Sequence, residues 1–208
     1  PDIIAALKKK IDSKLIATYV FNHESRAELV KLLANSAPEG LNKVFLLTTG
    51  SEATENTIKL ARTYGIRKGG REKHIIVSFK NAFHGRTFGA QMAGGSQELK
   101  EWIVNFDPGF VNVPFPDGFF NENRKFDVFL KSLDELGIDP KNVAGVITET
   151  YQGCGPFFMP VEYAHGLVSN IMALHQTSSR VARESPRPCP SQPLSGVMMS
   201  WISTNPEA

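Results

Sequence analysis

The sequence predicts an α/β fold with three layers, in which a predominantly parallel sheet lies between helices. Three observations lead to this prediction. Helix-like and strand-like segments alternate along the 208 residues. The strand-like segments are short apolar runs without polar alternation, which is typical of strands buried on both faces. The composition, with 41% hydrophobic and 21% charged residues, is that of a globular chain long enough to form a core without disulfide or metal.

Two helices are expected at the amino-terminal end. The first begins at Asp2, a good N-cap, and carries one apolar face. The second begins with the capping-box pattern of residues 25–28, Ser-Arg-Ala-Glu, and ends before Pro38. The apolar face of the first helix consists of Ile3, Leu7 and Ile11.

The next segments predict a strand, a long helix and a second strand. Residues 44–47, Val-Phe-Leu-Leu, are expected to form a buried strand. Residues 48–52 then lead into a helix that ends at Gly69 and Gly70. Residues 75–77, Ile-Ile-Val, form the next expected strand. The stripe expected to be buried along the helix consists of Ala53, Thr57, Leu60, Ala61 and Tyr64.

The same alternation continues to residue 147. Ser96 is expected to cap a helix that reaches Ile103, and residues 110–113 are expected to form a strand. A further helix over residues 126–133 ends at Gly137. Residues 143–147, Val-Ala-Gly-Val-Ile, are the last uninterrupted apolar strand.

The composition changes after Tyr163. Residues 164–208 contain 8 Ser and 5 Pro but no Lys, Asp or Phe. Residues 167–172 can form a short helix, whereas the prolines of residues 186–193 exclude a helix or a central strand. We therefore expect an α/β domain over residues 1–163 and an atypical tail over residues 164–208, which is either a flexible extension or a foreign, frame-shifted segment.

Several functional classes are disfavoured. The formal charge of +2 comes from 23 basic and 21 acidic residues that are interspersed, so no nucleic-acid partner is expected. No apolar run approaches the roughly 20 residues of a membrane span, and no signal peptide is apparent, so we expect a cytoplasmic protein and no membrane partner. Cys154 and Cys189 form no ligand set, so no metal is expected.

Three polar segments follow predicted strands, where ligands bind in open α/β sheets. The first, residues 48–53, combines Gly50 with the hydroxyls of Thr49 and Ser51 at a helix start. Free N–H groups there can bind an anion such as phosphate. The same residues also suit simple helix capping, so this segment alone leaves both interpretations open.

The other two segments are residues 81–87 and 149–155. In the first of these, Phe83 is either a core residue and His84 a hydrogen-bonded structural histidine, or both are, together with Arg86, contacts of a flat, charged ligand. In the second, Glu149 is either an ordinary solvated acid or a functional group at the end of a strand.

Taken together, four segments resemble the class III pyridoxal-phosphate aminotransferases of fold type I, which include the acetylornithine and 4-aminobutyrate aminotransferases. The resemblance covers about residues 1–163 and implies that the chain is an internal piece of an enzyme that is a homodimer. The segments that carry it are residues 50–53 (Gly-Ser-Glu-Ala), 59–62 (Lys-Leu-Ala-Arg), 83–87 (Phe-His-Gly-Arg-Thr) and 149–153 (Glu-Thr-Tyr-Gln-Gly).

The resemblance implies a cofactor, pyridoxal 5'-phosphate, and assigns residues to it. Arg86 would contact the substrate carboxylate, for which a guanidinium fork is suited. Phe83 would stack on the pyridine ring, and a helix N-terminus would hold the dianionic phosphate. The residues implied to bind the cofactor are Thr49, Gly50, Ser51, Phe83, His84 and Glu149.

The implied reaction moves an amino group from an amino donor, such as an ω-amino acid, to a 2-oxo acid. Cys154 stands where the acetylornithine and 4-aminobutyrate members have a second Glu, so neither substrate is assigned. The family's Schiff-base lysine and its pyridine-nitrogen Asp lie after the third segment, whereas the last Asp and Lys here are Asp139 and Lys141. No catalytic residue is therefore assigned, and this chain alone is expected to be inactive.

Two other interpretations remain. The chain is a non-catalytic remnant that binds pyridoxal phosphate or phosphate, or a misassembled product without function. A Rossmann-type nucleotide enzyme is less favoured, because no GxGxxG follows a predicted strand.

Overall fold

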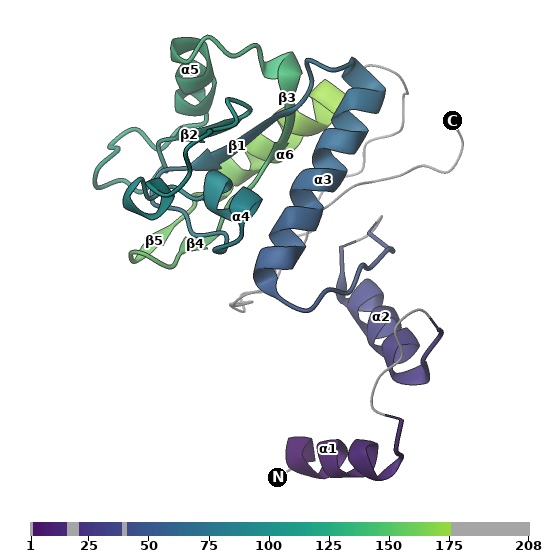
Figure 1. The fold of residues 1–208 in the computed structure, drawn as a ribbon. Coiled ribbons are helices and arrows are strands. Elements are labelled where there is room, and N and C mark those ends of the chain that lie inside the picture. Colours follow the sequence, from purple (N-terminus) through teal and green to yellow (C-terminus); the bar gives the residue numbers. More distant parts are fainter. Residues whose placement is uncertain (1, 16–20, 39–40, 176–208) are drawn as a thin grey trace. The chain divides into compact units, whose positions relative to one another are not determined.

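The computed structural model describes residues 2–15, 21–38 and 41–175, which are drawn as a coloured ribbon in Figure 1. The chain divides between Leu46 and Leu47 into two units, and each unit is described by itself. The expectations for residues 176–208 lie outside the described residues.

The amino-terminal unit contains the two predicted helices, α1 (Asp2–Asp12) and α2 (Glu24–Ser36). The capping-box prediction for residues 25–28 is wrong. The N-cap of α2 is His23, whose ring Nδ1 accepts a hydrogen bond from the Ser25 N–H at 3.2 Å. An imidazole nitrogen thus replaces the expected serine hydroxyl as the acceptor for a free N–H of the first turn.

The prediction of a strand at residues 44–47 is also wrong, because these residues form no regular helix or strand. The Phe45 side chain is 70% exposed. An apolar run becomes a buried strand only where a neighbouring strand can pair with it. None of the strands in the described residues pairs with residues 44–47. The segment instead leads directly into the next helix.

The second unit is built on a three-stranded parallel sheet. Its central strand, β1 (Ile75–Phe79), pairs in parallel with β2 (Phe110–Val113) and with β3 (Val143–Val146), which gives the order β2-β1-β3. These strands confirm the three expected in this part of the chain. A short antiparallel pair that was not expected, β4 (Tyr151–Gln152) and β5 (Phe157–Phe158), follows β3.

Helices cover both faces of the sheet, so the predicted three layers are confirmed (Figure 1). Helices α3 (Gly50–Gly69) and α4 (Phe88–Ala93) pack on one face, and α5 (Asp127–Glu135) and α6 (Val161–His175) on the other. The core cluster of the first face contains Ile58, Ile76, Ala93, Ala144 and Ile147. The core cluster of the second face includes Val77, Phe79, Phe129, Leu133, Tyr163 and Leu167.

Helix α3 confirms the long predicted helix, with a different buried stripe. It ends at Gly69, and its C-cap is Gly70, where φ is 77° and a glycine is favoured. The helix approaches the chain before β1 so closely that a Cβ on Gly65 would lie 2.5 Å from the Lys73 carbonyl oxygen. Its buried residues are Thr54, Ile58 and Gly65.

The prediction of a helix from Ser96 to Ile103 is wrong. The helical turn found there is the short 3₁₀ helix η1 (Glu98–Lys100). The Gln91 side chain of α4 donates to the Leu99 carbonyl, which an α-helix would have used for the Ile103 N–H. That N–H donates to the Lys100 carbonyl at 2.8 Å instead, so the turn tightens and stops.

Helix α6 crosses the boundary expected between residues 163 and 164. Tyr163 and Leu167 lie on either side of it and belong to the same core cluster. A second 3₁₀ turn, η2 (Pro140–Asn142), leads into β3, with the Asp139 carboxylate accepting from the Lys141 N–H at its start.

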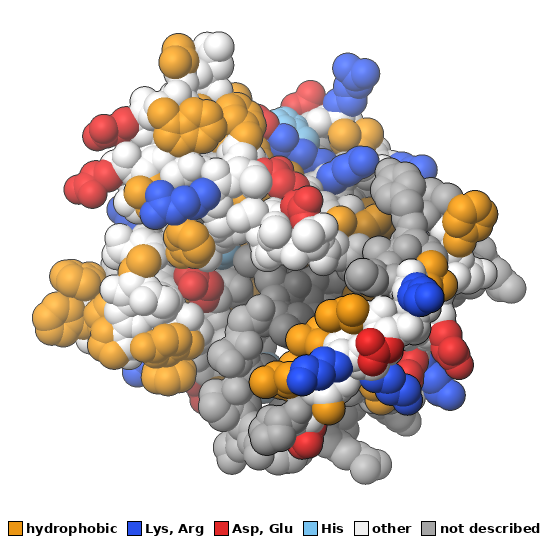
Figure 2. All heavy atoms as spheres, turned by 60° about the horizontal axis from the view of Figure 1, so that its bottom comes forward, with side chains coloured by type: hydrophobic (Ala, Val, Ile, Leu, Met, Phe, Trp, Pro, Cys, Tyr) orange, Lys and Arg blue, Asp and Glu red, His pale blue; other side chains and the backbone are white. Residues whose placement is uncertain are grey.

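The surface combines exposed hydrophobic groups with charges of both signs. Figure 2 shows orange side chains on one face together with blue and red ones. Among the described residues, the large exposed hydrophobic side chains include Ile3, Leu7, Phe119, Phe120 and Phe158.

Candidate functional site

The strand order defines where a ligand is expected to bind. After β1 the chain crosses to β2 on one side of it, and β3 then lies on the other side. This reversal between β1 and β3 is a topological switch point, and the crevice beyond the carboxyl ends of the two strands is the usual ligand site. Residues 80–87 follow β1 and residues 147–150 follow β3, so the second and third polar segments both lie at this edge.

The first polar segment forms the amino-terminal end of α3. Thr49 is the N-cap and makes a complete capping box with Glu52. Its Oγ1 accepts from the Glu52 N–H at 3.2 Å, while the Glu52 Oε2 accepts from the Thr49 N–H at 2.9 Å. These bonds fix the backbone at the helix start.

Open space lies beside Gly50 at this helix start. A Cβ on Gly50 would meet no heavy atom within 4 Å. The Glu52 and Ala53 N–H groups both donate to Thr49, which leaves the N–H groups of Gly50 and Ser51 without an acceptor within the helix. The helix dipole makes this end positive. The Ser51 hydroxyl is the neighbouring polar group, so the arrangement provides donors for an anion.

The second segment packs directly against the first. The Ser51 Oγ accepts a hydrogen bond from the Arg86 N–H at 3.3 Å. Gly85 has φ +128°, and a Cβ there would lie 2.4 Å from the Ser51 Oγ. The buried Thr54 Oγ1 donates to the His84 carbonyl oxygen at 2.8 Å. This approach requires glycine at position 85 and holds the loop against α3.

The third segment is joined to the second by Glu149. Its Oε2 accepts from the Phe83 N–H at 3.0 Å, and its Oε1 accepts from the Gly153 N–H at 3.3 Å. Glu149 is therefore not a fully solvated acid. Phe83 is 45% exposed, so part of its side chain is available for contact with another group.

His84 belongs to the same loop as Phe83 and has an unusual environment. Its side chain is 4% exposed, and neither ring nitrogen has a hydrogen-bond partner in the part of the chain that the structure describes. Burial, and then the positive charge of Lys100, lower the pKa of the imidazole from 6.5 to about 4. The ring is thus neutral at physiological pH and retains one donor and one acceptor.

The remaining predicted residues are exposed. The Arg86 side chain makes no ion pair among residues 2–15, 21–38 and 41–175, although its backbone is held by Ser51. Cys154 is a free, exposed thiol in the turn between β4 and β5. Cys189 lies outside the described residues.

Two residues that support the site, Glu55 and Gln152, were given no role from the sequence. The Glu55 Oε1 accepts from the Gly89 N–H at 2.8 Å and from the Ala90 N–H at 3.1 Å, which holds α4 directly after the second segment. The buried Gln152 side chain donates to the Lys80 carbonyl at 2.9 Å. Glu55 follows Ser51 by four positions, so helical periodicity was a signal that both share a face.

Two further features of residues 2–15, 21–38 and 41–175 concern membranes and metal ions. None of the helices there has the length and apolar character needed to cross a membrane. No cluster of three or more His, Cys, Asp or Glu side chains in the same ranges is arranged to bind a metal ion.

Comparisons with known proteins agree on one family. The sequence model described as "Aminotransferase class-III" matches residues 1–176. An acetylornithine aminotransferase of Methanopyrus kandleri is 32% identical over 163 residues, which are 78% of this chain and 36% of that protein. A putrescine–pyruvate aminotransferase of Pseudomonas aeruginosa is 31% identical over 158 residues, 73% of this chain and 35% of that protein.

Solved structures share the fold. An (S)-enantioselective omega-transaminase from Thermomicrobium roseum superimposes with a TM-score of 0.71 at 25% identity, over 82% of this chain and 40% of that one. The chain spans just over a third of the length of the curated relatives named above. The sequence match over residues 1–176 and the shared fold show that this chain belongs to the class III aminotransferase family.

Proposed function

We propose that this chain is part of a pyridoxal-phosphate-dependent aminotransferase that moves an amino group from an amino donor to a 2-oxo acid. Class III aminotransferases depend on this cofactor. The observation that carries the proposal is the set of hydrogen bonds that joins the three polar segments at the β1/β3 switch point, through Ser51, Thr54 and Glu149.

The start of α3 suits the phosphate of the cofactor. Open space lies beside Gly50 at the free N–H groups of the first turn, and the hydroxyls of Thr49 and Ser51 lie beside them. A dianionic phosphate is stabilised at such a helix end by both the dipole and the free donors. These residues would hold the phosphate without requiring a lysine or arginine.

The loop after β1 suits the flat ring. The half-exposed Phe83 offers an aromatic face, and its backbone is fixed by Glu149. The unpartnered nitrogens of the buried, neutral His84 are the kind of orphaned polar atoms that a bound group satisfies. The residues present therefore fit the phosphate and ring of pyridoxal phosphate.

The exposed Arg86 guanidinium is proposed to bind the carboxylate of the substrate, as a bidentate fork. The amino donor is proposed to be an ω-amino acid or a similar primary amine. The names of the acetylornithine and putrescine–pyruvate relatives are consistent with donors of this kind.

When bound, pyridoxal phosphate supplies an electron sink for the carbon that loses a proton. In this chain the last lysine is Lys141 and the last aspartate is Asp139, both before the third segment. We therefore propose that the chain holds and orients the cofactor, and that by itself it does not complete amino transfer.

The binding part of the proposal is tested by titrating the chain with pyridoxal phosphate and following the cofactor's absorbance and the protein's fluorescence. Phe83→Ala is expected to weaken binding about tenfold, since aromatic stacking contributes about 1 kcal/mol or more. Phe120→Ala, which removes another exposed ring, is the matched control. Equal affinity of Phe83→Ala and the unchanged chain would contradict the proposed ring contact.

The catalytic part is tested by borohydride reduction of the chain with pyridoxal phosphate, followed by peptide mapping. Diffuse labelling of several exposed lysines, with no turnover of an amino donor, supports the proposal. Stoichiometric labelling of one lysine together with turnover contradicts it.

The second candidate is a non-catalytic protein that binds the cofactor or phosphate alone. Tight, specific binding without turnover favours this candidate, provided that turnover is also absent when the lysine-bearing part of a relative is supplied as a second chain. For the active enzyme we propose a cytoplasmic homodimer. The exposed apolar side chains of α1, Ile3 and Leu7 among them, are consistent with a covered surface in the assembled protein.

A further inference from the structure

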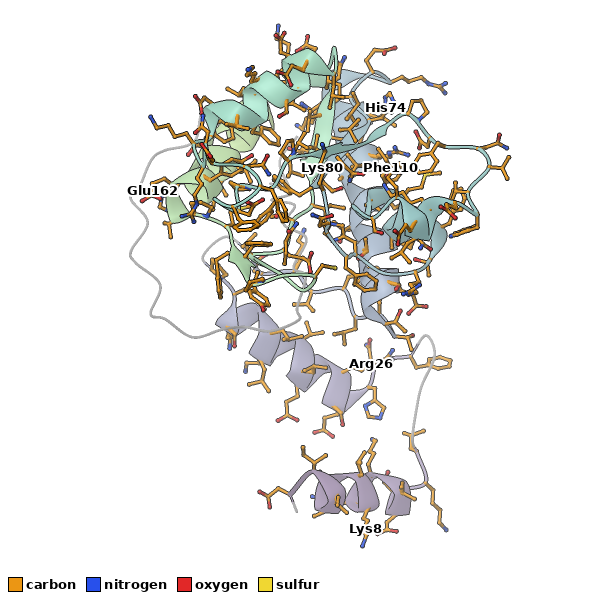
Figure 3. All side chains as sticks on the ribbon, turned by 90° about the vertical axis from the view of Figure 1, so that its left-hand side faces the viewer. Lys8, Arg26, His74, Lys80, Phe110 and Glu162 are labelled. Atoms are coloured by element: carbon orange, nitrogen blue, oxygen red, sulfur yellow. The ribbon has the colours of Figure 1, made fainter. Side chains whose placement is uncertain are left out.

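A cavity of about 420 Å³ opens beside the edge strand β2. It lies between the first residues after β1, the segment around η1, and β2 itself. None of the residues proposed to hold the cofactor lines it. Its polar lining comes from Lys80, Asn81, Gln97, Lys100 and Asn112, and its apolar lining includes Phe106, Phe110, Val111 and Leu136; Figure 3 labels Lys80 and Phe110.

Lys100 is the buried cation of this cavity. Its side chain is 3% exposed. The Nζ donates to the Asn112 Oδ1 at 2.8 Å and lies 5.4 Å from the centroid of the Phe106 ring. An ammonium group has three donors, so one neutral acceptor leaves donors available to a ligand.

No carboxylate of the described residues forms an ion pair with this charge. Neither Lys80 nor Lys100 forms an ion pair with an Asp or Glu side chain in the described part of the sequence. Burial of an uncompensated charge is unfavourable, and burial accordingly lowers the pKa of the Lys100 ammonium. An anion in the cavity would supply the missing counter-charge.

The position of the Lys100 ammonium is fixed by a hydrogen-bond network that includes the buried Ser78 hydroxyl. The Asn112 Nδ2 donates to the Ser78 Oγ at 2.6 Å and to the Ala93 carbonyl at 3.2 Å. The amide of Asn112 is therefore oriented with its oxygen toward Lys100. A charge that is already oriented binds a ligand with a smaller entropic cost.

The second lysine is held at the cavity by a rigid backbone. The Lys80 N–H donates to the Val113 carbonyl at 2.9 Å, and the Lys80 carbonyl accepts from Gln152 at 2.9 Å. Asn81 has φ 63°, and Gly95 packs so tightly that a Cβ there would lie 2.2 Å from the Asn81 nitrogen. The side chains of Lys80 and Asn81 are thus presented at the cavity by a fixed turn.

We propose that this cavity is a second anion site, distinct from the proposed cofactor site, which binds a small molecule through a phosphate or carboxylate group. Lys100 and Lys80 supply the positive charge, and the amides of Asn81 and Gln97 supply further donors. The apolar walls, including Phe106 and Leu136, accept the non-polar part of the ligand.

The test is residue-resolved NMR of the ¹⁵N-labelled 208-residue chain, titrated separately with inorganic phosphate and with succinate. The amide signals of Asn81, Gln97, Lys100 and Asn112 are expected to shift together with one dissociation constant. Signals of Gly50 and Ser51 report on the proposed cofactor site and are read independently. The probe that binds more tightly identifies phosphate or carboxylate as the preferred group.

Two variants decide whether the lysines carry the binding. Lys100→Met is expected to lower the affinity of the cavity for the bound probe about tenfold or more. Lys80→Gln, which leaves the hydrogen-bond network of Lys100 intact, is expected to lower it to a similar extent. Lys59→Met removes an exposed lysine of α3 outside the cavity and is expected to change nothing. The proposal is overturned if neither probe shifts the cavity signals, or if both cavity variants bind as the unchanged chain does.

Discussion

The Glu149 carboxylate accepts a hydrogen bond from the Phe83 N–H at 3.0 Å, across a sequence separation of 66 residues. Its other oxygen accepts from the Gly153 N–H at 3.3 Å. One side chain therefore joins the loop after β1, the loop after β3 and the β4–β5 turn. This is achieved because parallel strands end at the same edge of the sheet, and it gives Glu149 a positioning role that does not depend on any ligand.

Replacement of Glu149 tests this role. Glu149→Ala leaves two N–H groups without their acceptor and is expected to lower the free energy of unfolding by about 1–3 kcal/mol. Glu149→Gln keeps one acceptor oxygen and is expected to lose less. Urea unfolding of both variants is the measurement, with the exposed Glu122→Ala as control. Equal stability of Glu149→Ala and Glu122→Ala would contradict the role.

Gly85→Ala tests the contact between the second segment and α3. The φ of +128° is unfavourable for alanine, and its Cβ would lie 2.4 Å from the Ser51 Oγ. We expect a loss of about 2–4 kcal/mol, which combines backbone strain with the displacement of Ser51. The loss should be accompanied by weaker binding of pyridoxal phosphate.

Gly137→Ala is the matched control for this variant. Gly137 also has positive φ, 69°, but a Cβ there would meet no heavy atom within 4 Å. The free energy of unfolding of Gly137→Ala should fall only by about 1–2 kcal/mol, the cost of a left-handed backbone conformation for a residue other than glycine. Cofactor binding should be unchanged. If both variants lose the same stability and the same affinity, the contact with Ser51 has no separate effect.

The sheet could be predicted from the sequence to a large extent, as β1, β2 and β3 show. Each is an apolar run bounded by turn residues, and each pairs with a parallel neighbouring strand. Residues 44–47 have the same local pattern without forming a strand. The difference is whether a partner strand lies alongside, and that is a property of the tertiary fold.

The candidate site divides in a similar way. The types and positions of Thr49, Phe83 and Glu149 were apparent, because they follow strands and begin a helix. The support from Glu55 and Gln152 was not apparent, because each side chain bonds a backbone group far away in the sequence. Glu55 is 34 residues from Gly89, and Gln152 is 72 residues from Lys80. Side-chain patterns carry little information on such backbone partners.

Thr54→Val tests the buried link between α3 and the His84 backbone. Valine retains the shape of threonine but removes the hydroxyl that donates to the His84 carbonyl at 2.8 Å. An unpaired buried acceptor is expected to lower the free energy of unfolding by about 1–3 kcal/mol. Thr63→Val removes an exposed hydroxyl that bonds the Lys59 carbonyl on the same helix, and should change stability by less than about 0.5 kcal/mol. Chemical denaturation of the two variants distinguishes these outcomes.

His84 is expected to make the stability of the chain depend on pH. Burial, and then Lys100, lower its pKa from 6.5 to about 4 in the folded state. As the pH falls below 6.5, the unfolded chain binds a proton at this residue and the folded chain does not, so the unfolded state is favoured. The contribution of the neutral, buried His84 to the free energy of unfolding is therefore present above pH 6.5 and is lost toward pH 4. Between pH 7.5 and 5, the unchanged chain should lose about 2 kcal/mol more than His84→Gln. The exposed His165→Gln should follow the unchanged chain. Parallel pH profiles of all three in urea unfolding would show that His84 is protonated equally in both states.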